Sequence, residues 1–261
     1  MRHFDKHRFS EYAFTNEVMP SIDLHKETKK SGSVEIDQNK MLVTLPEKDG
    51  ATIPLDISVW LPFAAPKYQI SRDLNDYILT PVIVMPSDLP NRNAVAFPLL
   101  ELVKFHPNLG QQAYKSWKGK PTHYEHANDD ITKAYGVIAD SFMRKMVGFN
   151  HGRIWKILLL LAFDRSKNPD VVNRIISGDL NTYSMGAFIG SYTCSYCGEE
   201  LGNGCTHLDL DKPGVMYELG SKLVFRNVRD VEGFECSGVE SPAFLSALTD
   251  TIIHIKNPKN F

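Results

Sequence analysis

The sequence has no long apolar run. Its most apolar stretch, Ile157 to Phe163, covers about seven residues, whereas a helix that crosses a membrane needs roughly 20. The first residues, MRHFDKHRF, also lack the apolar core of a signal peptide. We therefore expect a soluble intracellular protein with no membrane partner.

The sequence also has no excess of charge of one sign. It contains 29 Lys and Arg residues against 31 Asp and Glu residues, and its formal net charge is -2. Basic residues gather only in two short stretches, 26–30 and 115–120. A nucleic-acid-binding surface typically needs a longer basic stripe. We expect no direct contact with nucleic acid.

Cysteine is scarce, and its placement is uneven. Three of the four cysteines are Cys194, Cys197 and Cys205, and His207 follows two residues after the last of them. This C-x-x-C and C-x-H spacing favours a tetrahedral zinc site over a disulfide framework. Four protein ligands leave no open coordination position, so the predicted zinc is structural. Cys236 is the alternative to His207 as the fourth ligand.

The chain has no internal repeats and no low-complexity tracts, and 43% of its residues are hydrophobic, enough for a substantial core. Residues 1–40 are polar and are predicted to form an arm or a removable extension, ahead of one domain over 41–261. Alternating and β-branched runs predict strands at 41–45, 53–61, 77–85, 134–143, 154–163, 182–192, 215–219, 222–225 and 233–240. Capping and turn residues predict helices near 98–105, 111–117, 169–177 and 242–255, and a hairpin turn at Gly148 to Gly152. The expected fold class is α+β, with a mainly antiparallel sheet or barrel, flanking helices and a zinc-binding insertion over about 192–210.

One serine stands in a small-residue context, NTYSMGAF, which places Ser184 before Gly186 and Ala187. Small neighbours let a substrate approach the backbone, where N–H groups can stabilise an oxyanion. A serine hydroxyl also needs a base within hydrogen-bond reach. His126 and His123, in the segment THYEHANDD, are the two candidates. Residue chemistry alone does not distinguish a catalytic Ser184 from an ordinary serine on a strand.

Several sequence landmarks from Val84 to Leu248 indicate a resemblance to a known family. In chain order they are NRN at 91–93 before a helix, GKP at 119–121 before His126, the run KILLLLAF followed by VVNRIISGD and NTYSMG, and FECSGV at 234–239 with Pro242-Ala243 behind it. In this order and spacing the chain resembles the prohead core protein proteases of T-even-like tailed phages. That family is similar in fold and catalytic chemistry to the herpesvirus capsid maturation protease.

The resemblance implies a catalytic set with Ser184 as nucleophile and His126 as general base. It suggests Asp140, at the end of the strand after the histidine, as the third member. Asp129, Asp130 and Glu125 are its rivals, and in the herpesvirus relatives the third member is another histidine. The cysteine loop departs from the T-even pattern, and we expect it to brace the strand that carries Ser184.

The resemblance further implies a serine endopeptidase that acts inside the phage prohead, in the host cytoplasm. Its substrates would be scaffold or core proteins and the major capsid protein, cut after Glu, and Ser33-Val34-Glu35 is a candidate self-processing site. The sequence does not decide whether the protein forms a homo-oligomer. The competing hypothesis is a non-enzymatic virion or scaffold-binding protein that uses the zinc loop for contacts.

Overall fold

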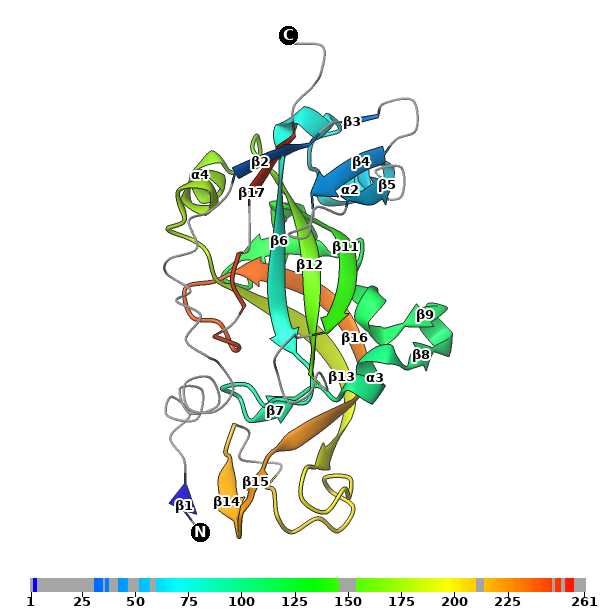
Figure 1. The fold of residues 1–261 in the computed structure, drawn as a ribbon, viewed down its shortest axis with the longest axis vertical. Helices are drawn as coiled ribbons and strands as arrows, with labels where there is room; N and C mark the ends of the chain where they lie inside the picture. The colour runs from blue at the N-terminus through cyan, green and yellow to red at the C-terminus, as the bar shows by residue number, and fades with distance from the viewer. Residues whose placement is uncertain are drawn as a thin grey trace.

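The computed structural model describes residues 60–145, 154–209, 214–245 and 247–249 with their side chains. Further short strands are described as backbone only: β1 (Arg2–His3), β2 (Ser31–Val34), β3 (Ile36–Asp37), β4 (Leu42–Pro46), β5 (Thr52–Asp56) and β17 (Ile252–Ile255). The predicted turn at Gly148 to Gly152 and Glu35 of the candidate processing site lie outside the described residues. The fold is α+β, with a curled, mixed β-sheet that forms a half-barrel and few helices (Figure 1).

The main sheet has nine strands, in the order β13-β16-β10-β11-β12-β6-β17-β2, with β7 paired to β16. Seven of its strands are described with their side chains, namely β6 (Tyr77–Pro86), β7 (Val95–Ala96), β10 (Pro121–Tyr124), β11 (Gly136–Lys145), β12 (Trp155–Asp164), β13 (Tyr183–Cys194) and β16 (Arg226–Gly238). The long strands pair antiparallel, whereas β10 with β16, β16 with β7, and β17 with β2 pair in parallel.

A short segment near the C-terminus curls this sheet. Leu248 forms an antiparallel bridge with Thr182, just before β13, and Thr249 forms one with Val82 of β6. The backbone N–H of Tyr183 donates to the carbonyl of Ala247 at 2.9 Å. The segment thus links β13, at one end of the strand order, to β6 in its second half, and this link gives the half-barrel its shape.

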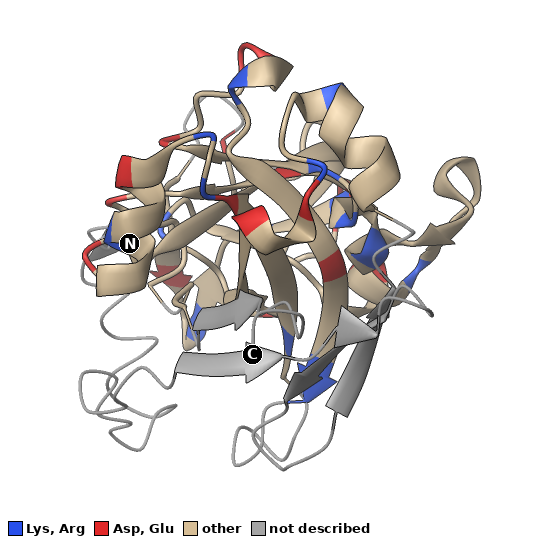
Figure 2. Ribbon diagram, turned by 90° about the horizontal axis from the view of Figure 1, so that it is seen from above, with Lys and Arg blue, Asp and Glu red and all other residues tan. Residues whose placement is uncertain are grey.

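The remaining elements lie around the sheet. They are the helices α2 (Leu61–Tyr68), α3 (Leu99–Val103) and α4 (Pro169–Ser177), the 3-10 turns η1 (Leu74–Asp76), η2 (Pro107–Leu109), η3 (Ala113–Trp117) and η4 (Ile131–Lys133), and the short strands β8 (Phe105–His106), β9 (Gln111–Gln112), β14 (Tyr217–Leu219) and β15 (Lys222–Val224). Figure 2 looks along the long axis of Figure 1 and shows the strands curving around the core, with acidic and basic residues interspersed. None of the described helices is long and apolar enough to span a membrane.

Strand β12 explains the apolar run of the sequence. Leu159 and Leu161 pack into the main core, whereas Leu160 and Ala162 pack on the opposite face, into a second core beneath α2. A strand buried on both faces carries a continuous apolar run, not an alternating one. The predicted strand at 154–163 is confirmed, as is its neighbour β11.

Helix α4 also forms where the sequence predicts it. The Asn168 side chain accepts a hydrogen bond from the N–H of Val171 at 3.2 Å, Pro169 occupies the first turn, and Gly178 ends the helix with a φ of 91°. This is the expected pattern of a side-chain N-cap and a left-handed glycine C-cap. Strand β13 is the next element along the chain after α4.

The predicted helix at 242–255 is wrong. Its first part forms turns and the bridges described above, and its last part is β17, which pairs with β6 and β2. The Phe244 ring is buried against Phe97, with ring centroids 6.4 Å apart, so tertiary packing fixes this segment. The β-branched residues Ile252, Ile253 and Ile255 favour a strand.

The prediction at 53–61 needs a smaller correction, because β5 ends at Asp56 and Leu61 already begins α2. The first turn of α2 contains a proline, which suits a helix start. Its buried residues cover the outer face of β11 and β12.

Candidate active site

His126 lies in a strained turn directly after β10. Glu125 and His126 have φ angles of 50° and 55°, in the left-handed region that residues with a Cβ seldom occupy. Two consecutive residues of this kind persist only where surrounding contacts hold them, and such strain gathers at functional sites.

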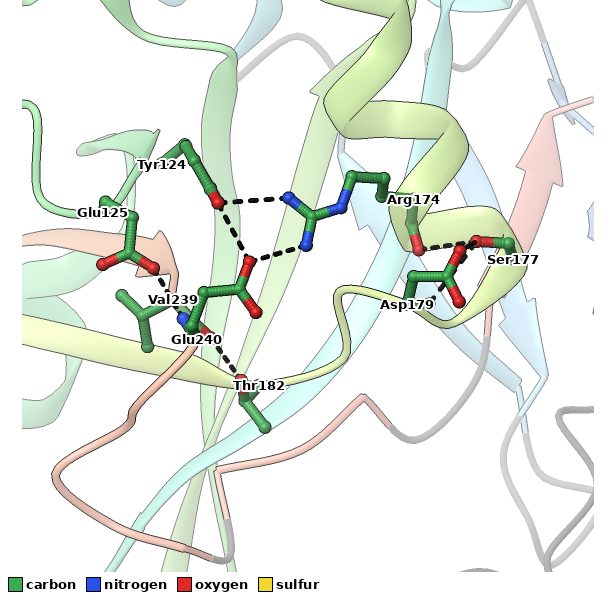
Figure 3. Close-up of polar contacts among 8 residues, drawn as sticks. All are labelled: Tyr124, Glu125, Arg174, Ser177, Asp179, Thr182, Val239 and Glu240. Atoms are coloured by element: carbon green, nitrogen blue, oxygen red, sulfur yellow. Dashed lines mark hydrogen bonds and ion pairs between the residues drawn. The ribbon is translucent and has the colours of Figure 1, made fainter.

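Hydrogen bonds hold this turn from several sides (Figure 3). The N–H of Glu125 donates to the carbonyl of Gly238 at 2.9 Å, and its carboxylate accepts from the N–H of Glu240 at 2.6 Å. Tyr124 donates its hydroxyl to Glu240 at 2.9 Å, and Arg174 of α4 reaches both Tyr124 and Glu240, at 3.1 and 2.6 Å. The end of β16 and helix α4 thus fix the backbone beside the histidine.

Glu235 of β16 is the carboxylate that meets His126. Its Oε1 lies 2.5 Å from Nδ1 of His126, and its side chain is only 1% exposed. Oε2 lies 3.3 Å from Nδ1 of His123 and accepts the hydroxyl of Ser237 at 2.9 Å. Burial raises the pKa of Glu235, but the hydrogen bonds from His123, His126 and Ser237 outweigh it and leave a pKa of about 2. Glu235 is therefore a carboxylate at neutral pH.

Ser184 is the second residue of β13 and lies across from Ser237 in the antiparallel ladder with β16. Ser237 in turn lies across from His123 in the parallel ladder with β10. Three neighbouring strands therefore bring these residues together. Ser184 and His126 both line one cleft of about 510 Å³, whose other lining residues are Val84, Asn91, Asn93, Val95, Phe97, Tyr183, Met185, Ala187, Ile189, Tyr192, Gly214, Arg226, Ala243 and Phe244.

Gly186 makes room for the acid. A Cβ at this position would lie 2.7 Å from Cγ of Glu235 and 2.5 Å from Cζ of Phe234, closer than such atoms approach. The sequence indicates that the small residues beside Ser184 leave space for a substrate. The structure gives a different reason for Gly186, because the side chains of Phe234 and Glu235 occupy the space that a Cβ would fill.

Asp140, the predicted third member, does not meet the histidine. It lies on β11, forms an ion pair with Lys118 at 3.3 Å and accepts the N–H of Ser141 at 2.8 Å. Glu235, and not Asp140, is the carboxylate that contacts His126. The catalytic role suggested for Asp140 remains a prediction, and its contacts do not support it.

The rival acids have other partners as well. Asp129 pairs with Lys133 at 3.0 Å, Asp130 accepts from the N–H of Thr132 at 2.9 Å, and Glu125 braces the turn. Glu235 was not among the acids predicted from the sequence, and it lies 109 residues after His126. Its only sequence signal is its place in the landmark FECSGV, two residues before Ser237.

The environment of His126 leads to a prediction about its titration. Its pKa is raised above the ordinary 6.5, because its hydrogen bond to Glu235 favours the charged ring; burial opposes this, and the charges of Glu235 and Glu125 add to it. We expect NMR titration of His126 to give a pKa above 6.5, and a lower pKa in Glu235→Gln. The unprotonated base, and with it any activity that needs it, should increase as pH rises through this pKa. A pKa at or below 6.5 in the wild type would contradict the contact with Glu235.

A second cluster lies at the far end of β13. One ligand atom from each of Cys194, Cys197, Cys205 and His207 lies within 4.8 Å of all the others. The sulfurs of Cys197 and Cys205 are 3.8 Å apart, and the sulfur of Cys205 is 4.0 Å from Nδ1 of His207. A zinc–sulfur bond of about 2.3 Å gives tetrahedral sulfur–sulfur edges of about 3.8 Å, so the cluster can hold a metal ion of this kind.

The loop that carries this cluster is attached to β13. The N–H of Cys194 donates to the carbonyl of Glu199, and the N–H of Leu201 donates to the carbonyl of Tyr192, both at 2.9 Å. The remaining cysteine, Cys236, is fully buried in the main core and does not belong to the cluster. The geometry therefore favours His207 over Cys236 as the fourth ligand.

Comparison with known proteins gives no protein family, no curated protein and no solved structure that matches this chain significantly.

Proposed function

We propose that this protein is a serine endopeptidase with Ser184 as nucleophile, His126 as general base and Glu235 as the acid that orients the base. One observation carries the proposal. His126 lies between a buried carboxylate, 2.5 Å from its Nδ1, and a cleft that it lines together with Ser184.

The contact with Glu235 defines how His126 would act. Because Nδ1 faces a carboxylate, it carries the ring proton, and Nε2 keeps the lone pair that a general base needs. Nε2 would take the proton of the Ser184 hydroxyl as its oxygen attacks the peptide carbonyl, and would then give that proton to the leaving amine. The Glu235 carboxylate would stabilise the imidazolium formed between these steps. Water, with His126 again as general base, would then attack the acyl group on Ser184 and release it as the carboxylic acid.

The cleft and the edge of β13 support a polypeptide as the substrate. The described ladder partners of residues 184–191 all lie on β16, and the cleft lining includes residues along β13 from Ser184 to Tyr192. At about 3.3 Å per residue, this stretch measures roughly 26 Å. Its other walls combine apolar side chains, such as Phe97 and Phe244, with polar ones, such as Asn91 and Asn93. An extended polypeptide added along β13 suits such a groove, and it favours an endopeptidase.

The narrower proposal is a prohead maturation protease with a herpesvirus-protease-like fold. The sequence landmarks between Val84 and Leu248 support it. The substrates would then be scaffold or core proteins and the major capsid protein, cleaved after Glu inside the phage prohead in the host cytoplasm. Self-processing after Glu35 and a homo-oligomer belong to the same proposal.

A direct test uses a fluorophosphonate probe, which labels activated serines, and Glu-containing scaffold or capsid peptides read by mass spectrometry. We expect the wild type to be labelled at Ser184 and to cut peptide bonds after Glu. A folded protein that shows neither labelling nor cleavage, in the presence or absence of proheads, would instead support the non-enzymatic scaffold-binding hypothesis.

We also propose that the cluster of three cysteines and His207 holds a structural zinc ion that fastens its loop to the end of β13. We expect one zinc per chain by elemental mass spectrometry, loss of this zinc in His207→Ala, and a lower Tm after chelation, because metal binding adds to folding stability. Cys236→Ala is the matched control and should keep its zinc. Zinc retained in His207→Ala but lost in Cys236→Ala would reverse the choice of fourth ligand.

A further inference from the structure

The two oxygens of Glu235 have different neighbours. Oε1 is the atom that meets His126, whereas Oε2 lies 3.3 Å from Nδ1 of His123 and 2.9 Å from the hydroxyl of Ser237. The side chains of Glu235 and His123 are 1% and 2% exposed. The orientation of this carboxylate is therefore set by protein groups and not by solvent.

These two neighbours of Oε2 come from paired strands. His123 of β10 lies across from Ser237 in the parallel ladder with β16, and Glu235 precedes Ser237 by two residues. Residues two apart on a strand project from the same face of a sheet, so the acid and both donors share one face. The donors to Oε2 thus belong to strands, whereas His126 stands in a turn outside them.

The second ring nitrogen of His123, Nε2, is buried. It has no hydrogen-bond partner among the described residues. An unpaired buried polar atom is unfavourable, and an apolar side chain would fill the same space without that penalty. The polar contact described for His123 is the one from Nδ1 to Glu235. The histidine is therefore explained by what it does to the acid.

We propose that His123 and Ser237 are positioning residues that hold Oε2 of Glu235, so that Oε1 stays directed at Nδ1 of His126. The catalytic consequence rests on the proposed function, but the geometric content does not. Without the two donors, the carboxylate can rotate in its pocket, and the imidazolium formed during catalysis loses a fixed counter-charge. A small misplacement of a catalytic group costs about 10- to 100-fold in rate.

The test compares variants that remove a donor with variants that keep one. Ser237→Ala and His123→Leu remove donors to Oε2, whereas Ser237→Thr keeps the hydroxyl and His123→Asn places an amide N–H near the position of Nδ1. The first readout is the low-field proton NMR signal of the His126 Nδ1–H, assigned by its absence in His126→Gln. We expect it to shift upfield or broaden in the two removing variants and to persist in the two conservative ones.

The second readout is steady-state kinetics on a cleaved peptide, with active sites counted by the fluorophosphonate probe. The removing variants should lose about 10- to 100-fold in kcat per active site, with KM changed by less than about twofold, because binding of the substrate is not altered. The conservative variants should recover most of this loss.

An unchanged His126 signal in folded Ser237→Ala and His123→Leu would overturn the proposal. So would a loss of activity that only follows the fraction of unfolded protein, measured by thermal melting. If the wild type cleaves nothing, the proposed function fails, whereas the NMR comparison still decides whether the two residues position Glu235.

Discussion

Replacing Ser184 by alanine is expected to lower kcat by about 10⁴-fold or more, because removal of the nucleophile of such a set costs most of the rate enhancement. The substitution deletes one oxygen from a side chain that is not fully buried, so the fold should remain intact. Peptide cleavage followed by mass spectrometry, together with probe labelling, measures the effect. Circular dichroism and thermal melting verify the fold.

Ser191→Ala is the matched control for this prediction. Ser191 lies on the same strand and pairs with Arg229, but it does not belong to the cleft lining. It should keep full activity and full labelling at Ser184. Equal activity of Ser184→Ala and wild type would exclude Ser184 as the nucleophile and with it the proposed reaction.

Replacing Glu235 by glutamine should also be severe, with kcat lowered by about 10⁴-fold, as is typical when the acid of such a set loses its charge. Glutamine has nearly the same size, but its amide can present an N–H to His126 in place of a carboxylate oxygen. The ring would then favour the tautomer with the proton on Nε2, where the lone pair is needed. The measurement is kcat and KM on the same peptide, and KM should change little.

Asp140→Asn separates the two possible acids. In the structure Asp140 pairs with Lys118 at a partly exposed site, so this variant should keep at least about half of the activity, since exposed ion pairs contribute little. Strong loss in Asp140→Asn combined with an active Glu235→Gln would restore the assignment suggested by the resemblance and contradict the geometry described above.

Local patterns were sufficient for part of this fold. The N-cap and C-cap of α4 and the apolar run of β12 are read within a dozen residues, and both elements form as predicted. The metal cluster is similarly local, because Cys194 and His207 belong to one loop. The helix predicted for the C-terminal segment does not form, because the burial of Phe244 and the pairing of β17 with β6 depend on residues far away in the chain.

The acid that contacts His126 could not be predicted in this way. A single glutamate on a strand has no local pattern that marks it, and its meeting with His126 depends on the parallel pairing of β10 with β16. The resemblance pointed to Ser184 and His126, and the structure places both at one cleft. Neither the spacing of residues nor the hydrophobic periodicity of the sequence can predict which of several acids will contact a given histidine in the folded protein.

The parallel pairing of β10 with β16 also has a consequence in time. His126 and Glu235 are 109 residues apart in the chain. At a synthesis rate of about 5–20 residues per second, roughly 5 to 20 seconds separate the appearance of the two residues at the ribosome. During this interval no carboxylate is in place to orient the histidine. Under the proposed function, a growing chain therefore cannot cut neighbouring nascent chains, and proteolysis begins only after translation has passed β16 and that strand has docked.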